Sequence, residues 1–404
     1  EPGMSRILFC VVPERGHVNP CIGPALALKG SGHAVAFHAP GDIRPQLQAA
    51  GGFACFGPDE SPRPADWRRG ATFAAQVCDP AWLREWVRSL LLDNVGVEVE
   101  RIRDSIRKWR PDVVVVDPLL YAAAIAADAE GLPWVAMSNS LNPVLPPTLD
   151  SDLLRTVRWL APQREALFAA YGMAPLFRGC DVISPWLTLA FATEAFVPDA
   201  PADIALVGPS MPAGPRGDEP DFPWDRLDPT LPLVYMSLGS QIYYQPTMFA
   251  TVIEALRDQP AQLVMSIADL LDTDELPALG GRMLAVRYAP QLAMLERASL
   301  FITHGGANSV MEALTSGVPM IVSPLCNDQF HQAHFVEAAG VGRRMDLHAA
   351  SPGQVATTIA GLLGSTEVRS RLARIARDYR RSGADEAARL ISGLAAENRP
   401  ATGS

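Results

Sequence analysis

The sequence predicts an α/β fold of two doubly wound (Rossmann-like) parallel-sheet domains that face each other across a cleft. Its 404 residues exceed what a single hydrophobic core usually organises. Both halves contain strand–helix–strand patterns in which glycine follows the helix, and such patterns build parallel sheets. A stretch crowded with Pro, Gly and Asp separates the two halves, which is typical of a linker between domains.

The first half, residues 4–200, is predicted to form the N-terminal domain. Gly30, Gly32 and Gly131 mark the ends of two helices. The expected elements are strand 7–12, turn 13–16, helix 25–29, strand 34–37, strand 112–116, helix 121–130 and strand 134–137.

The second half begins after the linker 201–232 and forms a domain of residues 233–380. Its expected elements are strands 233–236, 262–266, 283–287, 300–303 and 320–323, with helices 248–257, 309–315 and one from Gln332. Residues 366–394 have a helical pattern, and we expect 381–404 to form a helix that packs back toward the N-terminal domain, followed by a disordered tail.

An arginine-rich face is expected at the start of this last helical region. We interpret it as a solvated face, because Asp378, Asp385 and Glu386 dilute its charge. A peripheral membrane contact is the less favoured interpretation. The arginines are Arg369, Arg371, Arg374, Arg377, Arg380 and Arg381.

Composition limits the class of partner. The formal net charge of −10 repels polyanions and argues against a nucleic-acid binder. A small phosphate ligand remains possible, because backbone N–H groups and a helix N-terminus hold it at short range. Oligomeric state is not readable, and both a monomer and a homodimer are compatible with the sequence.

The location expected from the sequence is cytoplasmic. Residues 7–12 are too short for the apolar core of a signal peptide. The longest apolar run, 113–127, is interrupted by Asp117 and Pro118 and falls short of a membrane span. The six cysteines show no metal or disulfide spacing, so we expect reduced, buried thiols.

The segment richest in chemistry lies at residues 288–329. A buried strand, 300–303, runs into His304-Gly305-Gly306-Ala307-Asn308-Ser309 and then a helix. This order aims backbone N–H groups and the positive end of the helix dipole at one point, which suits a diphosphate without a metal. His304 and Ser309 add donors, and Glu312 is placed to accept hydrogen bonds from ribose hydroxyls.

With these motifs in place, nearly the whole chain resembles the family one nucleotide-sugar-dependent glycosyltransferases of GT-B fold, which include macrolide, carotenoid and other natural-product enzymes. The resemblance implies that the C-terminal domain binds the donor and that the N-terminal domain binds the acceptor. Tyr288 stands where many members carry Trp, and tyrosine still stacks on a base. The implied donor-binding residues are Ser237, Gly239, Ser240, Tyr288, Ala289, Gln291, His304, Gly306, Asn308, Ser309, Glu312, Asp328 and Gln329.

A second constellation, Gly16-His17-Val18-Asn19-Pro20, follows the first strand, where open α/β sheets place their ligands. Taken alone, His17 is more often structural, and an Asp before Pro, such as Asp117, is usually a turn former. The resemblance implies that His17 is the general base and that Asp117 is its partner.

Other candidates are weaker. Asp150-Ser151-Asp152 and Asp272-Thr273-Asp274 match a short metal-binding pattern that occurs often by chance, and His331, His334 and His348 lack metal spacing. We therefore expect no metal and no cofactor. Some aromatic residues of 53–95 and 138–190 are expected to line an apolar acceptor pocket.

The resulting hypothesis is an inverting, metal-independent hexosyltransferase that acts on a nucleoside-diphosphate sugar and an apolar small-molecule acceptor. UDP-glucose is the favoured donor, and a dTDP-sugar is possible. Two alternatives stay open: a sugar-nucleotide epimerase on the same fold, and a non-catalytic small-molecule binding module. A dinucleotide oxidoreductase is disfavoured, because neither half has G-x-G-x-x-G after its first strand.

Overall fold

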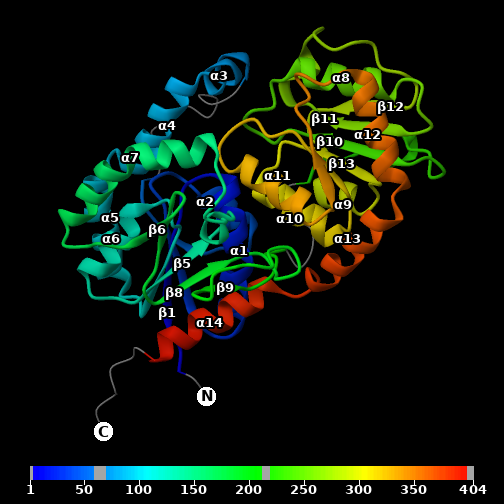
Figure 1. Ribbon diagram of the computed structural model, residues 1–404. Helices are drawn as coiled ribbons and strands as arrows, with labels where there is room; N and C mark the ends of the chain where they lie inside the picture. Colours follow the sequence, from blue (N-terminus) through cyan, green and yellow to red (C-terminus); the bar gives the residue numbers. More distant parts are fainter. Residues whose placement is uncertain (1–2, 59–69, 212–218, 398–404) are drawn as a thin grey trace. The chain divides into compact units, whose positions relative to one another are not determined.

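The chain forms two compact units, each built around its own parallel sheet, in a computed structural model that describes residues 3–58, 70–211 and 219–397 (Figure 1). Within those residues, the first unit takes in 3–58, 84–211 and 381–397, and the second takes in 70–83 and 219–380. Each sheet is α/β and doubly wound, as predicted.

The first unit contains a seven-stranded sheet of order β3-β2-β1-β4-β5-β8-β9, all parallel. Strand order reverses between β1 and β4, which pair in register so that Cys10 lies opposite Val116. The loops that leave these two strands therefore start side by side. The strands are β1 (Arg6–Cys10), β2 (Ala34–His38), β3 (Ala54–Phe56), β4 (Val113–Val116), β5 (Trp134–Ser138), β8 (Leu187–Ala190) and β9 (Ile204–Leu206).

Helices and a small hairpin complete this unit. The helix α6, almost wholly Ala and other apolar residues, is buried along its length, and Trp134 and Phe168 are core residues. The additional elements are α1 (Arg15–Gly30), α2 (Arg44–Ala49), α4 (Pro80–Leu92), α5 (Val95–Trp109), α6 (Tyr121–Ala129), the 3₁₀ helix η1 (Asn142–Val144), α7 (Asp152–Ala169), α14 (Gly383–Glu397) and the antiparallel strands β6 (Leu176–Arg178) and β7 (Asp181–Ile183).

Helix α1 begins earlier than predicted. The expected turn 13–16 and helix 25–29 are replaced by one helix from Arg15 to Gly30 that runs through Pro20 and Pro24. Proline lacks the N–H that a helix interior needs, so Pro20 and Pro24 are unusual residues for the interior of a helix. The first turn of α1 is therefore helical where a loop was expected.

The end of the chain returns to the first unit. The helical stretch predicted over 366–394 is two helices, and the second, α14, packs along α1 (Figure 1). Small residues allow the close approach: a Cβ on Gly23 would lie 2.9 Å from Cβ of Ala384. The backbone N–H of Gly383 also donates to the carbonyl of Pro209 at 3.0 Å.

The second unit repeats the same strand order. Its six parallel strands lie in the order β12-β11-β10-β13-β14-β15, and order reverses between β10 and β13, where Ser237 lies opposite Thr303. The strands are β10 (Leu233–Ser237), β11 (Gln262–Ser266), β12 (Met283–Val286), β13 (Leu300–Thr303), β14 (Met320–Val322) and β15 (Gly342–Arg344).

Helices complete the second unit, as they do the first. All six arginines of 369–381 are exposed, in agreement with a solvated face. The elements are α3 (Gly70–Val77), η2 (Trp224–Arg226), α8 (Pro246–Leu256), η3 (Ala268–Asp272), α9 (Gln291–Leu295), α10 (Ala307–Ser316), α11 (Gln329–Ala338), α12 (Pro352–Gly364) and α13 (Thr366–Asp378).

Two further expectations need revision. The predicted linker 201–232 begins too early, because β9 is the edge strand of the first sheet; residues 212–218 of that linker and the predicted tail beyond 397 lie outside the described residues. The six cysteines are unpaired, but not all are buried: Cys78 is exposed and Cys55 partly so.

Stability should fall as pH decreases from 7 to 5, in part through the buried His331 of α11. Burial, and secondarily the charge of His334, lowers the pKa of His331 to about 4. The unfolded chain takes up this proton near pH 6.5, whereas the folded chain takes it up only near pH 4, so stability is lost across that window. The difference corresponds to roughly 3 kcal/mol. His331→Asn should flatten the pH dependence of chemical unfolding relative to the exposed control His348→Asn; equal slopes would contradict the prediction.

Candidate active site

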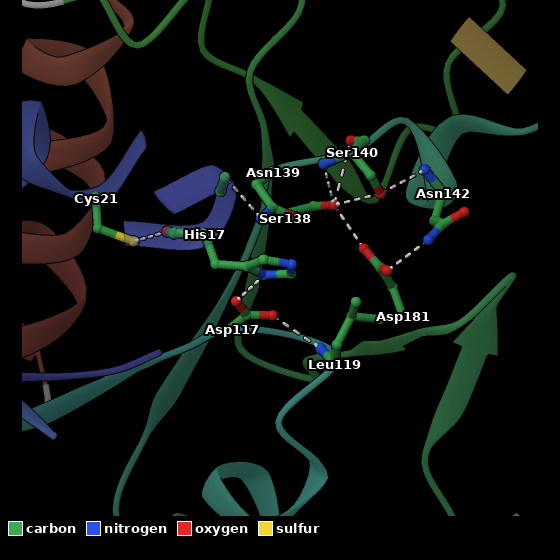
Figure 2. Close-up of polar contacts among 10 residues, drawn as sticks. His17, Cys21, Asp117, Leu119, Ser138, Asn139, Ser140, Asn142 and Asp181 are labelled. Atoms are coloured by element: carbon green, nitrogen blue, oxygen red, sulfur yellow. Dashed lines mark hydrogen bonds and ion pairs between the residues drawn. The ribbon is translucent and has the colours of Figure 1, made fainter. Parts of the chain in front are cut away.

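A histidine–aspartate pair lies where strand order reverses in the first unit. His17 occupies the first turn of α1, directly after β1, and Asp117 is the residue that follows β4. Nδ1 of His17 lies 2.6 Å from Oδ2 of Asp117, and the two side chains point toward each other (Figure 2). The parallel register of β1 and β4 brings these two residues, 100 positions apart in the sequence, to one edge of the sheet.

The two side chains differ in exposure. The Asp117 carboxylate is only 3% exposed and its Oδ1 accepts a hydrogen bond from the backbone N–H of Leu119 at 3.0 Å, whereas the imidazole is 18% exposed. Because a carboxylate accepts, Nδ1 carries the proton toward Asp117 and Nε2 is the basic nitrogen. A fixed carboxylate behind the ring stabilises the imidazolium that forms when Nε2 takes a proton. The thiol of the neighbouring Cys21 stays protonated, since burial and then the charge of Asp117 raise its pKa.

The second unit has a glycine-lined cradle at its own reversal point. The loops after β10 and β13 touch there: a Cβ on Gly239 would lie 2.9 Å from the His304 ring, and a Cβ on Gly306 would lie 2.8 Å from Nε2 of His304. Gly305 has a φ of +90° and Val322 would collide with any side chain on it. The backbone thus closes tightly around His304 because glycine stands at these positions.

His304 is neutral at pH 7, because its pKa lies well below that pH. Burial lowers its pKa to about 4, and a hydrogen bond with the Ser237 backbone opposes this only in part. Its Nδ1 is buried without a hydrogen-bond partner in the structure. A neutral imidazole can still donate one N–H to a phosphate oxygen, and a hydrogen bond to such a charged group contributes roughly 1.5–3 kcal/mol.

The N-terminal turn of α10 completes this cradle. Its N-cap residue is Gly306, which has no side chain to cap the first N–H groups, and Asn308 and Ser309 lie in that turn. Uncapped N–H groups at the positive end of a helix are suited to an anion.

The predicted nucleoside and ribose residues also come together. Nε2 of Gln291, on α9, donates to Oε2 of Glu312 at 2.6 Å and to Oγ of Ser309 at 3.2 Å. Tyr235 OH also donates to Oε1 of Gln291 at 3.3 Å. Glu312 is buried, so this network aligns α9 with α10.

The remaining donor candidates lie at the same edge of the second sheet. Ser237 is buried and Ser240 is exposed. The Tyr288 side chain is 38% exposed, which leaves its ring open to stack on a base. The backbone N–H of Ala289 donates to Oγ of Ser266. Asp328 is the N-cap residue of α11. The side-chain oxygen of Gln329 accepts from the N–H groups of Leu325 and Cys326, so its amide nitrogen is the group that can donate to a sugar.

Comparison with known proteins agrees with this geometry. Residues 229–387 match the family model described as UDP-glucoronosyl and UDP-glucosyl transferase, and residues 83–210 match that of the Erythromycin biosynthesis protein CIII-like, N-terminal domain. The chain is 26% identical to the NDP-glycosyltransferase YjiC of Bacillus subtilis (strain 168), with 93% of this chain and 94% of the relative covered. Together these matches support a glycosyltransferase of family one.

Two further similarities extend over the whole chain. The glycosyltransferase is 26% identical to the oleandomycin glycosyltransferase of Streptomyces antibioticus, with 94% of this chain and 88% of the relative covered. It also superposes on the solved structure of the glycotransferase of kitacinnamycin with a TM-score of 0.76 and 25% identity, covering 98% of this chain and all of the other. These neighbours have the GT-B fold, so the predicted fold class is confirmed.

The short Asp-x-Asp motifs have structural roles in the glycosyltransferase. Asp150 and Asp152 pair with Arg155, and Ser151 caps α7. Asp272 pairs with Arg287 at 2.6 Å. No group of three metal-ligating side chains occurs among the described residues, and none of the helices described is long and apolar enough to cross a membrane.

One polar network near His17 was missed by the sequence reasoning. The buried Asp181 accepts from Oγ of Ser138 at 2.5 Å and from Nδ2 of Asn142 at 2.8 Å, which fixes the loop after β5 (Figure 2). The signal available was Ser138-Asn139-Ser140 directly after a predicted strand, at the same edge as His17 and Asp117. The aromatic residues of 53–95 and 138–190, some of which were expected at the acceptor pocket, differ in exposure: Phe168 is core, whereas Trp159, Tyr171 and Trp186 are exposed.

Gly306→Ala should weaken nucleotide binding at least tenfold, because its Cβ would displace the His304 ring although the backbone angles at 306 suit alanine. Titration calorimetry with UDP measures this. Gly361→Ala on α12 is the matched control, since nothing lies within 4 Å of its added Cβ. Unchanged UDP affinity in Gly306→Ala would show that the cradle is not the diphosphate site.

Proposed function

We propose that this glycosyltransferase transfers a hexose, with inversion, from a nucleoside-diphosphate sugar to a hydroxyl of an apolar natural product. UDP-glucose is the favoured donor, and neither a metal nor a cofactor is required. The observation that carries the proposal is the 2.6 Å pair between His17 and Asp117 at the carboxyl end of β1 and β4. Such a pair is what an alcohol acceptor needs, because an alcohol is a poor nucleophile until its proton is removed.

The reaction follows from the groups at the two reversal points. Nε2 of His17 takes the acceptor proton, the acceptor oxygen bonds to the anomeric carbon, and the bond from that carbon to the diphosphate breaks. The diphosphate leaves with the bonding electrons, and the N-terminal turn of α10, with Asn308 and Ser309, stabilises its charge. Attack from the face opposite the leaving group inverts the anomeric carbon.

Hexose recognition rests on the pair at the start of α11. The Asp328 carboxylate can accept from sugar hydroxyls, and the Gln329 amide can donate to them, since its oxygen is already engaged. A 2,6-dideoxy or 4-keto sugar would leave these groups partly unpaired, which disfavours it. The apolar acceptor is supported by the similarity to the oleandomycin enzyme.

His17→Ala should lower kcat by roughly 10²–10⁴-fold, the usual magnitude of general-base catalysis, while UDP affinity in the second unit stays near normal. Asp117→Asn should cost less, because the ring keeps its place but loses the stabilising charge. Steady-state kinetics with an unactivated alcohol and an acidic phenol test this, and the deficit should shrink for the phenol. Wild-type turnover by His17→Ala on the alcohol would return His17 to a structural role.

UDP-glucose should give a higher kcat/KM than dTDP-linked deoxysugars when polyphenol, macrolide and carotenoid acceptors are screened by mass spectrometry. A better deoxysugar donor would overturn the donor assignment. Conversion of the sugar nucleotide in the absence of an acceptor would indicate an epimerase. Binding of an acceptor that is not glycosylated with any of the donors would indicate a binding module.

The same assay in excess EDTA tests metal independence. Activity should be unchanged, because backbone N–H groups and a helix N-terminus, rather than a divalent ion, are proposed to hold the diphosphate. Loss on chelation with recovery on adding manganese or magnesium would contradict this.

A further inference from the structure

Two prolines inside α1 leave two of its carbonyl groups without their helical donors. In a helix each carbonyl accepts from the N–H four residues later. The carbonyls of Gly16 and Pro20 would accept from residues 20 and 24, which are both prolines and have no N–H. A proline ring also crowds the carbonyl four residues earlier and turns it outward.

Side chains from two other loops bond to these carbonyls instead. Nδ2 of Asn139, in the loop after β5, donates to the Gly16 carbonyl at 3.2 Å. Oγ of Ser210, in the loop after β9, donates to the Pro20 carbonyl at 2.6 Å. Because both acceptors are carbonyls, Asn139 must present its amide nitrogen and Ser210 its hydroxyl hydrogen.

The two replacement hydrogen bonds differ in their distance from His17, the proposed base. Gly16 immediately precedes His17, so the Asn139 hydrogen bond acts on the peptide that joins the base to the preceding residue. Pro20 lies almost one turn further along α1, and the Ser210 bond is buried against the rest of the unit. The Asn139 hydrogen bond therefore affects the orientation of the His17 imidazole. The Ser210 hydrogen bond affects how α1 packs against the rest of the unit.

Asn139 is itself held in place on both sides. The preceding residue, Ser138, is fully buried and donates to Asp181, and Asn142 donates to the other oxygen of the same carboxylate. Oγ of Ser140 also accepts from the backbone N–H of Asn142 at 3.1 Å. The loop is thus anchored by the buried Asp181, and Figure 2 shows this network beside the His17–Asp117 pair.

We propose that Asn139 is a positioning residue: by replacing the helical hydrogen bond that Pro20 forbids, it sets the orientation of the first turn of α1 and hence of His17. This inference rests on the proposed role of His17 as the base. Asp117 fixes the ring at Nδ1, and Asn139 fixes the backbone from which the ring extends. A base displaced by about 1 Å can lose on the order of a hundredfold in rate.

A double-mutant cycle between residues 20 and 139 tests the proposal. Asn139→Ala should lower kcat about tenfold on benzyl alcohol with UDP-glucose, less on 4-nitrophenol, and leave the donor KM within twofold. Pro20→Ala restores a backbone N–H at the position that serves the Gly16 carbonyl. In the Pro20→Ala background, Asn139→Ala should therefore change kcat less than twofold and should lower Tm less than it does alone.

Ser210→Ala is the matched control, since it removes the same kind of bond away from His17. It should lower Tm by roughly 2–6 °C, as expected for a lost buried hydrogen bond, with kcat within twofold. An equal kcat loss from Asn139→Ala in both residue-20 backgrounds would overturn the proposal, and so would no loss in either, or an equal loss from Ser210→Ala.

His17→Ala separates this inference from the proposed function. In that background, Asn139→Ala should have no further effect on the residual turnover, because the residue acts through His17. If His17→Ala itself kept full turnover, the proposed function would fail, while the Tm coupling between residues 20 and 139 would still decide whether the amide replaces the helical bond.

Discussion

Parallel pairing at the point where strand order reverses is the constraint on which both sites depend. In the first unit β1 and β4 end together, with Cys10 opposite Val116, and in the second unit β10 and β13 end together, with Ser237 opposite Thr303. Neighbouring strands whose helices depart to opposite faces leave a gap at their carboxyl ends, and loops from distant parts of the chain meet there. In the proposed mechanism, one unit uses this place for a proton acceptor, and the other uses it to hold the diphosphate.

The two sites achieve order by different physical means. Around His17 the positioning groups are polar: a buried carboxylate bonds to the imidazole, and a side-chain amide bonds to the carbonyl of Gly16. Around His304 the order is steric, because Gly239 and Gly306 allow backbone to lie directly against the ring. The first arrangement suits a ring that must change charge during turnover. The second suits a ring that stays neutral and presents donors to a charged ligand.

Much of the fold was predictable because buried parallel strands are short apolar runs bounded by glycine. β11 and β13 were predicted with their observed bounds, and β2, β4, β5 and β10 to within one residue at either end. The start of α1 was not predictable, because Pro20 and Pro24 are helix breakers unless donors arrive from elsewhere, and those donors, Asn139 and Ser210, are more than a hundred residues away. The family motif indicated His17 and Asp117, whereas Asn139, which is proposed to position His17, is not part of that motif. The neutral state of His304 was likewise invisible, since it depends on burial by residues from another loop.

The return of α14 to the first unit has a consequence for how the chain is made. The helix comprises residues 383–397, and it packs on α1, which the ribosome produces long before it. The residues described for the second unit end at 380, so that unit can complete its core while α14 is still in the exit tunnel. The first unit, although most of it emerges earlier, must wait with one side of α1 uncovered until α14 has left the tunnel. The unit that carries the proposed base is therefore completed only after the second unit has been synthesised, and the emergence of one helix sets when it can mature.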